Sequence, residues 1–393
     1  MKNIIQIIVL IILFTSCSAS REKDFISADP LGGEPPPETI MSENIDDSIY
    51  EVQFINENLG FAGAKQNVLK TIDGGESWSE WDPQKARGQG WNLTPSITEI
   101  LFISESVGFI NRGYGKLFKT SDGGISYEQI YELESGVIMD IYYENGTLFL
   151  SGSNIKKSSL YDDDDGENNP TSFRKNTMIL TSENDGESFK IFDFEDSNDA
   201  NNEIYDTHGH FSLIVKNNIL FFDIGYSNAG YQRTEKNWVV RFDLNTNDLE
   251  DFVYNDDRQS FLDSGMIIET PPIRIKSYSK VDNYIYAFGH YFRPSSDSKE
   301  DNGFIYSTNN GESWTYKSFG KYEEITFFSS YFSSTNVGYI VGELGHFLKT
   351  TDGGNTWTKI DLGTYRNIFD IEKVNENTLI LVGEDGFIYK YTM

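Results

Sequence analysis

Residues 342–357 read GELGHFLKTTDGGNTW, which is typical of two short strands joined by a turn. The core of this stretch is Thr-x-Asp-Gly-Gly-x-x-Trp. The Asp oxygens can accept backbone N–H groups of their own turn. The glycines suit positions of positive φ. The Trp begins the next strand and supplies a large apolar side chain. Nothing in this unit requires a substrate.

The same core recurs four times earlier in the chain. Its aromatic ends fall at residues 78, 127, 189, 314 and 357, at intervals of 49, 62, 125 and 43. The third interval equals two steps of about 62 residues with one copy missing, and such multi-stranded repeats are typical of a β-propeller. We expect these residues to build the turns: Asp73, Gly75, Trp78, Asp122, Gly124, Tyr127, Asn184, Gly186, Phe189, Asn309, Gly311, Trp314, Asp352, Gly354 and Trp357.

These units resemble Asp-box (BNR) repeats. The run Val337–Gly342 followed by Thr350–Trp357 resembles the photosystem II stability/assembly factor-like propellers. The resemblance covers residues 45–393 as a repeat pattern. It implies an all-β, seven-bladed propeller of four-stranded antiparallel blades, without catalytic activity. It specifies the fold far better than the function.

The N-terminus has the pattern of a bacterial lipoprotein. Lys2 precedes the apolar run Ile4–Phe14, which has signal-peptide length and is too short to span a membrane. Cys17 follows at once and is the only cysteine of the 393 residues, so we expect lipidation there. Ser18 favours the outer membrane by analogy with enterobacterial sorting. Residues 1–16 are therefore interpreted as a signal peptide, 17–44 as a tether with a possible closing strand, and 45–393 as the propeller.

Seven blades are expected, over residues 48–82, 97–132, 136–194, 209–253, 273–319, 324–361 and 367–393. Blade 4 lacks the repeated turn, and Leu249–Tyr254 is predicted as its last strand. The chain ends before blade 7 has a fourth strand, which would leave an open edge. We expect an N-terminal segment to pair with Phe387–Tyr391. Thr39–Met41 is the first choice and Phe25–Ile26 the second.

The connections between blades and strands are uneven. In a four-stranded blade, the loops between the second and third strands lie on the face opposite the repeated turns. Blades 3, 4 and 5 have long loops there, Asn154–Asn176, Gly225–Asn237 and Tyr291–Asn302. Loops of this length are often functional. Aromatic and Arg residues are typical interface anchors, and the candidates are Trp91, Tyr161, Tyr226, Tyr231, Arg233, Tyr291, Phe292 and Arg293.

Three features of the sequence could carry chemistry, and each also has a plainer interpretation. The run Asp162–Asp165 departs from the helix-loop-helix calcium pattern, so we interpret it as a solvated acidic loop. His208 and His210 would share one side of a strand, but zinc needs a third ligand that the sequence does not identify. Sialidases with Asp boxes require clustered arginines, and the 10 Arg residues here are scattered. No catalytic residue, metal or cofactor is expected.

The net charge of −29 repels nucleic-acid phosphates, so nucleic acid is not expected as a partner. The sequence therefore predicts a lipid-anchored scaffold that binds one or more unknown envelope proteins. The alternative is a carbohydrate-active propeller, similar to a sialidase or a glucan hydrolase.

Overall fold

The computed structural model describes residues 47–64, 68–81, 97–112, 115–133, 136–157, 173–194, 205–228, 236–244, 267–270, 273–291 and 303–393. The described strands belong to a compact unit that runs from Pro36 to Met393. Apart from three short 3-10 turns, the described regular structure consists of strands. Within this part of the chain, no helix is long and apolar enough to cross a membrane.

The strands form seven antiparallel sheets, one for each blade. Blades 1 to 4 consist of β1 (Ile49–Phe54), β2 (Gly60–Ala64), β3 (Val68–Thr71) and β4 (Ser79–Trp81); β5 (Ile97–Phe102), β6 (Gly108–Arg112), β7 (Lys116–Thr120) and β8 (Glu128–Glu132); β9 (Gly136–Glu144), β10 (Thr147–Lys157), β11 (Phe173–Ser182) and β12 (Lys190–Phe194); and β13 (Tyr205–Lys216), β14 (Ile219–Asn228), β15 (Lys236–Asp243) and β16 (Ile267–Thr270). Blades 5 to 7 consist of β17 (Ile273–Val281), β18 (Tyr284–Tyr291), β19 (Gly303–Ser307) and β20 (Thr315–Ser318); β21 (Phe327–Phe332), β22 (Gly338–Gly342), β23 (Phe347–Thr350) and β24 (Thr358–Ile360); and β25 (Ile368–Asn375), β26 (Thr378–Gly383) and β27 (Ile388–Thr392).

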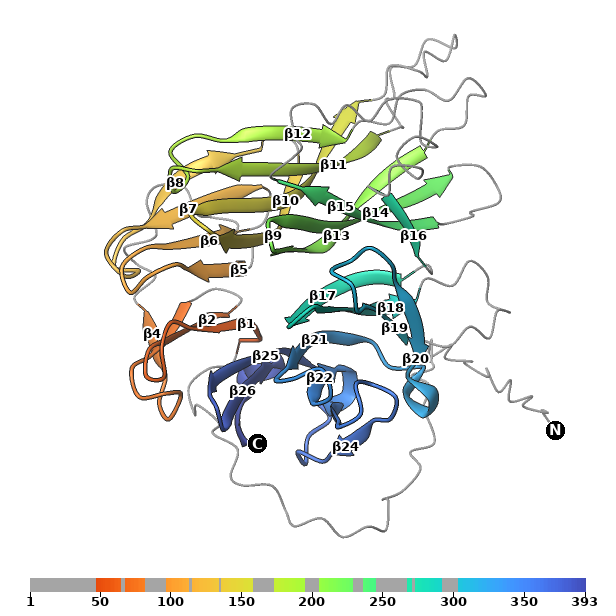
Figure 1. Cartoon of the computed structure of the whole chain (residues 1–393). Coiled ribbons are helices and arrows are strands. Elements are labelled where there is room, and N and C mark those ends of the chain that lie inside the picture. The colour runs from red at the N-terminus through yellow and green to blue at the C-terminus, as the bar shows by residue number, and fades with distance from the viewer. Residues whose placement is uncertain are drawn as a thin grey trace, which may run out of the picture. The chain divides into compact units, whose positions relative to one another are not determined.

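The first strands of the blades contact one another in sequence order, from β1 through β5, β9, β13, β17 and β21 to β25. β25 also contacts β1, so the blades close into a ring around these innermost strands (Figure 1). The predicted seven-bladed β-propeller is therefore confirmed. An apolar cluster that includes Val52, Ala62, Ile380 and Val382 fills the seam between blades 7 and 1.

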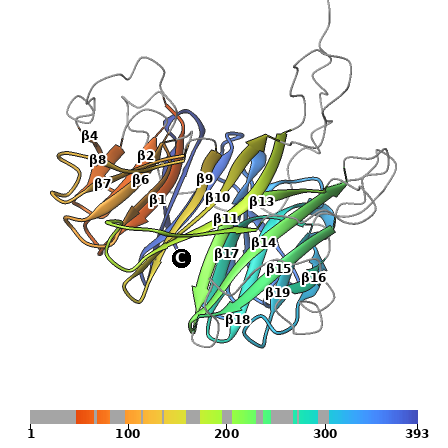
Figure 2. The same cartoon turned by 90° about the horizontal axis from the view of Figure 1, so that it is seen from above.

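Each blade is a simple meander in which every strand pairs with the next, as β13, β14 and β15 of blade 4 show in Figure 2. Successive strands run in opposite directions. The repeated turns, between the third and fourth strands, therefore share one face of the ring with the first hairpins. We call this the turn face. The opposite face carries the other connections, and we call it the loop face.

Blade 7 has three described strands, in the order β25-β26-β27. The sequence predicted this short count. The segments proposed to complete the blade, Thr39–Met41 and Phe25–Ile26, lie outside the described residues.

The predicted last strand of blade 4 was wrong. Residues 267–270 form β16, and this strand pairs with β15 through Trp238↔Glu269 and Val239↔Ile268. The predicted strand, Leu249–Tyr254, contains two consecutive acids at 250 and 251, whereas β16 begins with two β-branched isoleucines that suit a sheet. Without a repeated turn, blade 4 offered no local signal to decide between them.

The three long loops of the loop face are shorter than predicted. In blade 3, β10 and β11 continue as a hairpin to the pair Lys157↔Phe173, which leaves residues 158–172 between them. β14 likewise extends to Asn228, and β18 to Tyr291. A two-stranded ladder can continue beyond the sheet because each added residue pair brings further backbone hydrogen bonds.

Candidate functional site

The repeated turn of blade 6 uses its carboxylate within the turn itself. Asp352 Oδ1 accepts hydrogen bonds from Thr350 Oγ1 (2.9 Å) and from the backbone N–H of Thr356 (2.8 Å). Its Oδ2 accepts one from Thr356 Oγ1 at 2.7 Å. Thr350 Oγ1 also accepts the N–H of Gly354 at 2.8 Å. The side chains of Thr350 and Asp352 thus hold the turn together through hydrogen bonds to its own backbone and hydroxyl groups.

The same contacts occur in the other four turns, including those with Asn. Asn184 Oδ1 accepts from Ser182 Oγ (2.8 Å) and from the backbone N–H of Ser188 (3.0 Å). Its Nδ2 donates to Ser188 Oγ at 2.9 Å. Because a hydroxyl can donate or accept, Ser188 reverses its role when the carboxylate becomes an amide. Asn309 makes the equivalent contacts.

Two substitutions of Asp352 test whether the turn needs an acceptor oxygen or a negative charge at this position. Asp352→Asn should leave the free energy of unfolding nearly unchanged, since Asn already serves in two turns. Asp352→Ala should lower it by about 1–2 kcal/mol, because the Thr356 N–H and two hydroxyls lose their acceptor. Urea unfolding of both variants measures the difference. Equal losses for the two variants would contradict this account of the turn.

The carboxylates of these turns have lowered pKa values. Hydrogen bonds from the backbone and then the hydroxyl of Thr356 lower the pKa of Asp352. The corresponding bonds from Ser126 lower the pKa of Asp122. A general acid would need the opposite shift. The turn carboxylates are therefore suited to accept hydrogen bonds in their charged form.

The second glycine of the turn presses against the preceding blade. Gly311 has φ +79°, and a Cβ there would lie 2.1 Å from Phe221 Cε1 of blade 4. A Cβ at Gly354 would lie 2.5 Å from Phe304 Cζ of blade 5. Glycine is required both by the left-handed backbone and by the close approach. The turn therefore fixes the spacing between neighbouring blades.

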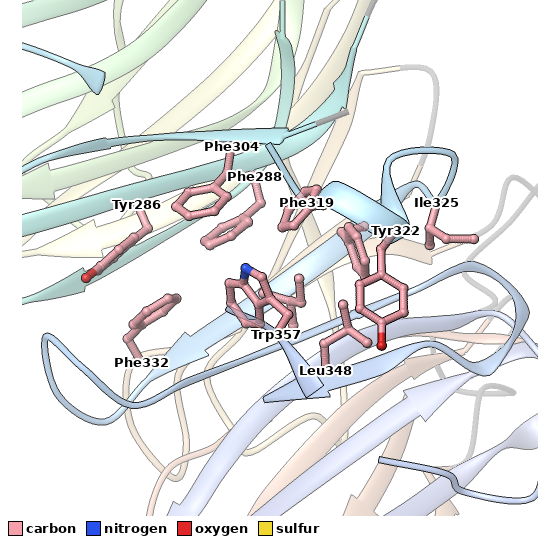
Figure 3. Close-up of a cluster of buried hydrophobic side chains, with 11 residues drawn as sticks. Tyr286, Phe288, Phe304, Phe319, Tyr322, Ile325, Phe332, Leu348 and Trp357 are labelled. Carbon is pink, nitrogen blue, oxygen red and sulfur yellow. The ribbon is translucent and has the colours of Figure 1, made fainter. Parts of the chain in front are cut away.

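The aromatic residue that ends the turn lies in the same seam. Trp357 is buried among Phe288 and Phe304 of blade 5 and Phe332 at the end of β21 (Figure 3). Its ring is nearly perpendicular to all three, at 84–88° with centroids 6.1–6.4 Å apart. Its buried Nε1 has no hydrogen-bond partner among the described residues. Figure 3 shows this nitrogen directed toward the Phe288 and Phe304 rings.

A second set of acids joins the blades at the innermost strands. Asp370 Oδ2 of blade 7 accepts the backbone N–H of Val52 in blade 1 at 2.9 Å. Glu51 Oε2 accepts the N–H of Ile100 in blade 2 at 2.5 Å. Asp140 Oδ2 of blade 3 accepts the N–H of Leu213 in blade 4 at 2.7 Å. These carboxyls act as hydrogen-bonded links between neighbouring blades.

A recurrent β-bulge precedes these side chains. The register of the first hairpin shifts between residues 49 and 51, 97 and 99, 275 and 277, 327 and 329, and 368 and 370. A bulge bends the strand and redirects its side chains. Here it immediately precedes Glu51, Glu99 and Asp370, and also the hydroxyl of Ser329, which donates to Asp370 Oδ1 at 2.6 Å.

These inner carboxyls hold their protons more tightly than usual. Burial raises the pKa of Asp140 to about 7. Burial and then the charge of Asp370 raise the pKa of Glu372 to about 8. Burial, followed by neighbouring carboxylates, raises the pKa of Glu51 and Glu99 well above the usual value. The sites are partly accessible to water but surrounded by protein atoms, so the ionised form is poorly solvated.

The free energy of unfolding should fall as the pH rises from about 5 to about 8, because the unfolded chain releases these protons near pH 4 while the folded chain retains them. Each titrating carboxyl contributes a slope of up to about 1.4 kcal/mol per pH unit in this window. Burial and then the charge of Lys280 lower the pKa of Lys216 to about 8. This lysine makes the free energy of unfolding rise with pH, but only above about pH 8, outside this window. Urea midpoints across this range measure the slope. Asp140→Asn keeps an acceptor for Leu213 and should reduce the slope; a slope unchanged in that variant would contradict the assignment.

Most of the predicted partner-binding residues lie outside the described residues: Trp91, Tyr161, Tyr231, Arg233, Phe292 and Arg293. The backbones of Tyr226 and Tyr291 lie near or at the loop-face ends of β14 and β18, and their side chains are not described. Cys17 and the acidic run Asp162–Asp165 are also outside. His208 and His210 lie in β13. The described side chains contain no group of three or more His, Cys, Asp or Glu suited to a metal ion.

The inner carboxyls are not among the residues predicted from the sequence. A signal was available in retrospect: acceptor and donor of one link lie one repeat apart, 49 residues from Glu51 to Ile100 and again from Gln53 to Phe102. Gln53 Oε1 accepts the N–H of Phe102 at 2.6 Å, and its Nε2 donates to the carbonyl of the same residue at 3.0 Å. Recognising these pairs requires knowing which strands are innermost, which the repeats alone do not show.

No protein family model matches the chain, and no curated protein matches it. Solved structures match it as a fold. YCF48 from Cyanidioschyzon merolae is 14% identical with a TM-score of 0.56, covering 90% of this chain and 98% of that chain. A structure of YCF48 bound to D1 peptide is also 14% identical, with a TM-score of 0.54, and covers 91% of this chain and 99% of that chain. An extracellular domain of a hybrid two-component system from B. thetaiotaomicron is 12% identical, with a TM-score of 0.54, and covers 90% of this chain and 39% of that chain. At these identities the likeness concerns the fold alone.

Proposed function

We propose that this chain is a non-catalytic, lipid-anchored propeller of the bacterial cell envelope that binds or helps to assemble other proteins through its loop face. One observation carries the non-catalytic part. The recurring carboxylates are held by hydrogen bonds within their own turns, as in Asp352, and the inner ones by backbone N–H groups of the next blade, as in Asp370. The acids that recur from blade to blade are therefore engaged in hydrogen bonds that hold the propeller together.

The partner-binding part is supported by the loop face and by one structural neighbour. On that face, the connections between the second and third strands are longer in blades 3 to 5, at residues 158–172, 229–235 and 292–302, than in the other four blades. A YCF48 propeller of the same fold has been solved with a D1 peptide bound, so this fold can hold a polypeptide. The anchoring part is supported by the apolar run ending at Phe14 and by Cys17. Acyl chains contribute about 0.8 kcal/mol per buried CH₂, so several together bind a membrane firmly.

The proposal is tested by affinity capture with the full-length lipidated chain from its own membrane. Trp91→Ala and Arg233→Ala should each reduce capture of a specific protein at least about tenfold without lowering the melting temperature, as expected of interface anchors. Ile125→Ala, which alters a half-exposed side chain on the turn face, is the matched control and should capture normally. Cys17→Ser should move the protein into the soluble fraction.

Two results would contradict parts of this proposal. A protein that stays in the membrane after Cys17→Ser is not anchored through that thiol. Steady turnover of sialosides or glucans, abolished by Asp370→Asn in a folded variant, would replace the binding proposal with the carbohydrate-active alternative.

A further inference from the structure

The outer edge of blade 7 has no partner strand among the described residues. β27 pairs with β26 through Leu379↔Tyr391 to Val382↔Ile388, and its other side faces no described strand. The other six blades each have a fourth strand at this place. An open edge presents unpaired N–H and C=O groups and is a template for another strand.

We infer that Thr39–Met41 pairs with β27 as the fourth strand of blade 7, so that the chain before it leaves the ring on the turn face. The pairing stands independently of the proposed function. Its consequence for the orientation of the loop face rests on the proposed lipid anchor.

The lengths of the equivalent connections decide between the two candidate segments. In the six other cases, the fourth strand and the next innermost strand are joined by 15, 3, 10, 2, 8 and 7 residues, at 82–96, 133–135, 195–204, 271–272, 319–326 and 361–367. Thr39–Met41 would leave the seven residues 42–48 before β1, the same length as the connection from blade 6 to blade 7. Phe25–Ile26 would leave 22 residues, more than any of the six.

Blade 6 supplies the register, because it matches blade 7 at an offset of 41 residues. Glu343 accepts the backbone N–H of Thr326 at 3.2 Å, and Glu384 accepts that of Asn367 at the same distance. The short turns that follow contain Leu344 (φ 55°) and Asp385 (φ 53°) at the same position. β27 therefore occupies the place of β23.

The pairing of β23 with β24 can then be transferred. Phe347 pairs with Ile360 and Lys349 with Thr358. At the offset of 41, Ile388 and Lys390 take the places of Phe347 and Lys349. Because the connection from blade 7 to blade 1 would have the same length as that from blade 6 to blade 7, their partners are Met41 and Thr39. The apolar Met41 would take the place of Ile360, a partly buried side chain that packs against the core.

The direction of the new strand places the tether. β27 runs from the loop face to the turn face, so an antiparallel partner begins on the turn face at Thr39 and ends toward the loop face at Met41. Residues 17–38 would then depart from the turn face. A membrane-anchored propeller would accordingly offer its loop face, with the candidate partner-binding residues, on the side opposite the point where its tether leaves.

Cysteine cross-linking tests the pairing. In the full-length chain carrying Cys17→Ser, Thr39→Cys with Lys390→Cys should form a disulfide nearly completely under mild oxidation, since directly opposite residues meet the required geometry. Phe25→Cys with Lys390→Cys is the matched control and should react at least about tenfold more slowly, because its effective concentration is set by a long tether. Peptide mapping identifies the bond. Faster reaction at position 25 would overturn the assignment.

A second measurement does not depend on thiol chemistry. Deleting residues 38–42 should increase the hydrogen-exchange rates of the β27 amides at least about tenfold, while the amides of β23 in blade 6 keep their rates. Unchanged protection of β27 after this deletion would also overturn the pairing.

A dye on each face tests the orientation. In vesicles of the lipidated protein, a quencher on the lipid headgroups should quench a dye at Ile125→Cys more strongly than one at Tyr365→Cys. These residues are 49% and 71% exposed and lie on the turn face and loop face. Cross-linking at Thr39 together with stronger quenching at Tyr365 would contradict the proposed orientation and leave the strand pairing intact. Cross-linking without vesicle binding would leave the pairing intact and remove the anchor.

Discussion

Trp357→Ala is expected to lower the free energy of unfolding by about 3–5 kcal/mol, the usual cost of removing a buried Trp side chain. Trp357 is 8% exposed and packs against four phenylalanine rings in the seam between blades 5 and 6. Its removal would leave a cavity between two blades, and the surrounding rings can collapse into it only in part. Urea unfolding of the purified chain measures the loss.

Two further variants identify the cause of that loss. Trp357→Phe should lose much less, because it keeps an aromatic ring in the seam and the indole N–H has no acceptor to forfeit. Tyr365→Ala removes an aromatic side chain that is 71% exposed and should change the free energy of unfolding by less than about 0.5 kcal/mol. A small effect of Trp357→Ala would mean that the turn aromatics do not hold the seams.

Gly311→Ala is expected to cost about 2–5 kcal/mol through two additive causes. The left-handed backbone disfavours alanine by about 1–2 kcal/mol. Overpacking against Phe221, whose Cε1 would lie 2.1 Å from the new Cβ, adds about 1–3 kcal/mol. Thermal and urea unfolding report the sum.

Gly320→Ala isolates the first cause. Gly320 also has positive φ (+60°), but a Cβ there meets nothing within 4 Å. Its cost should therefore be limited to the backbone component. If the two variants lost the same free energy, the contact between the turn and the preceding blade would have no part in stability.

The sequence predicted the ring because one local unit repeats. The Asp, Gly and aromatic positions of the turn at Asp352–Trp357 have a local physical meaning, and its five copies indicated a propeller. The number of seven blades followed from the expected strands along the chain and from the family resemblance. Where the unit is missing, in blade 4, the fourth strand was placed at Leu249–Tyr254 instead of β16. The extent of the β10–β11 hairpin was also missed, since polar residues such as Asn154 resembled a loop.

The contacts between blades could not be predicted from the repeat. Whether Gly311 faces Phe221, or Glu51 accepts the N–H of Ile100, depends on how two blades pack, and these partners are 90 and 49 residues apart. A local pattern explains why a glycine takes positive φ. It does not indicate that the same glycine must also lack a Cβ because another blade approaches it. The inner carboxyls were missed for the same reason.

The repeated acids, on this account, stabilise the propeller and take no part in binding. This is tested most directly by the dissociation constant of the captured partner, measured with Asp352→Ala at a temperature where this variant is folded. The turn lies on the face opposite the loops at residues 158–172, 229–235 and 292–302, so we predict the wild-type value alongside a lowered melting temperature. A folded Asp352→Ala protein that loses the partner would show that the repeated acids take part in binding, and would contradict the account.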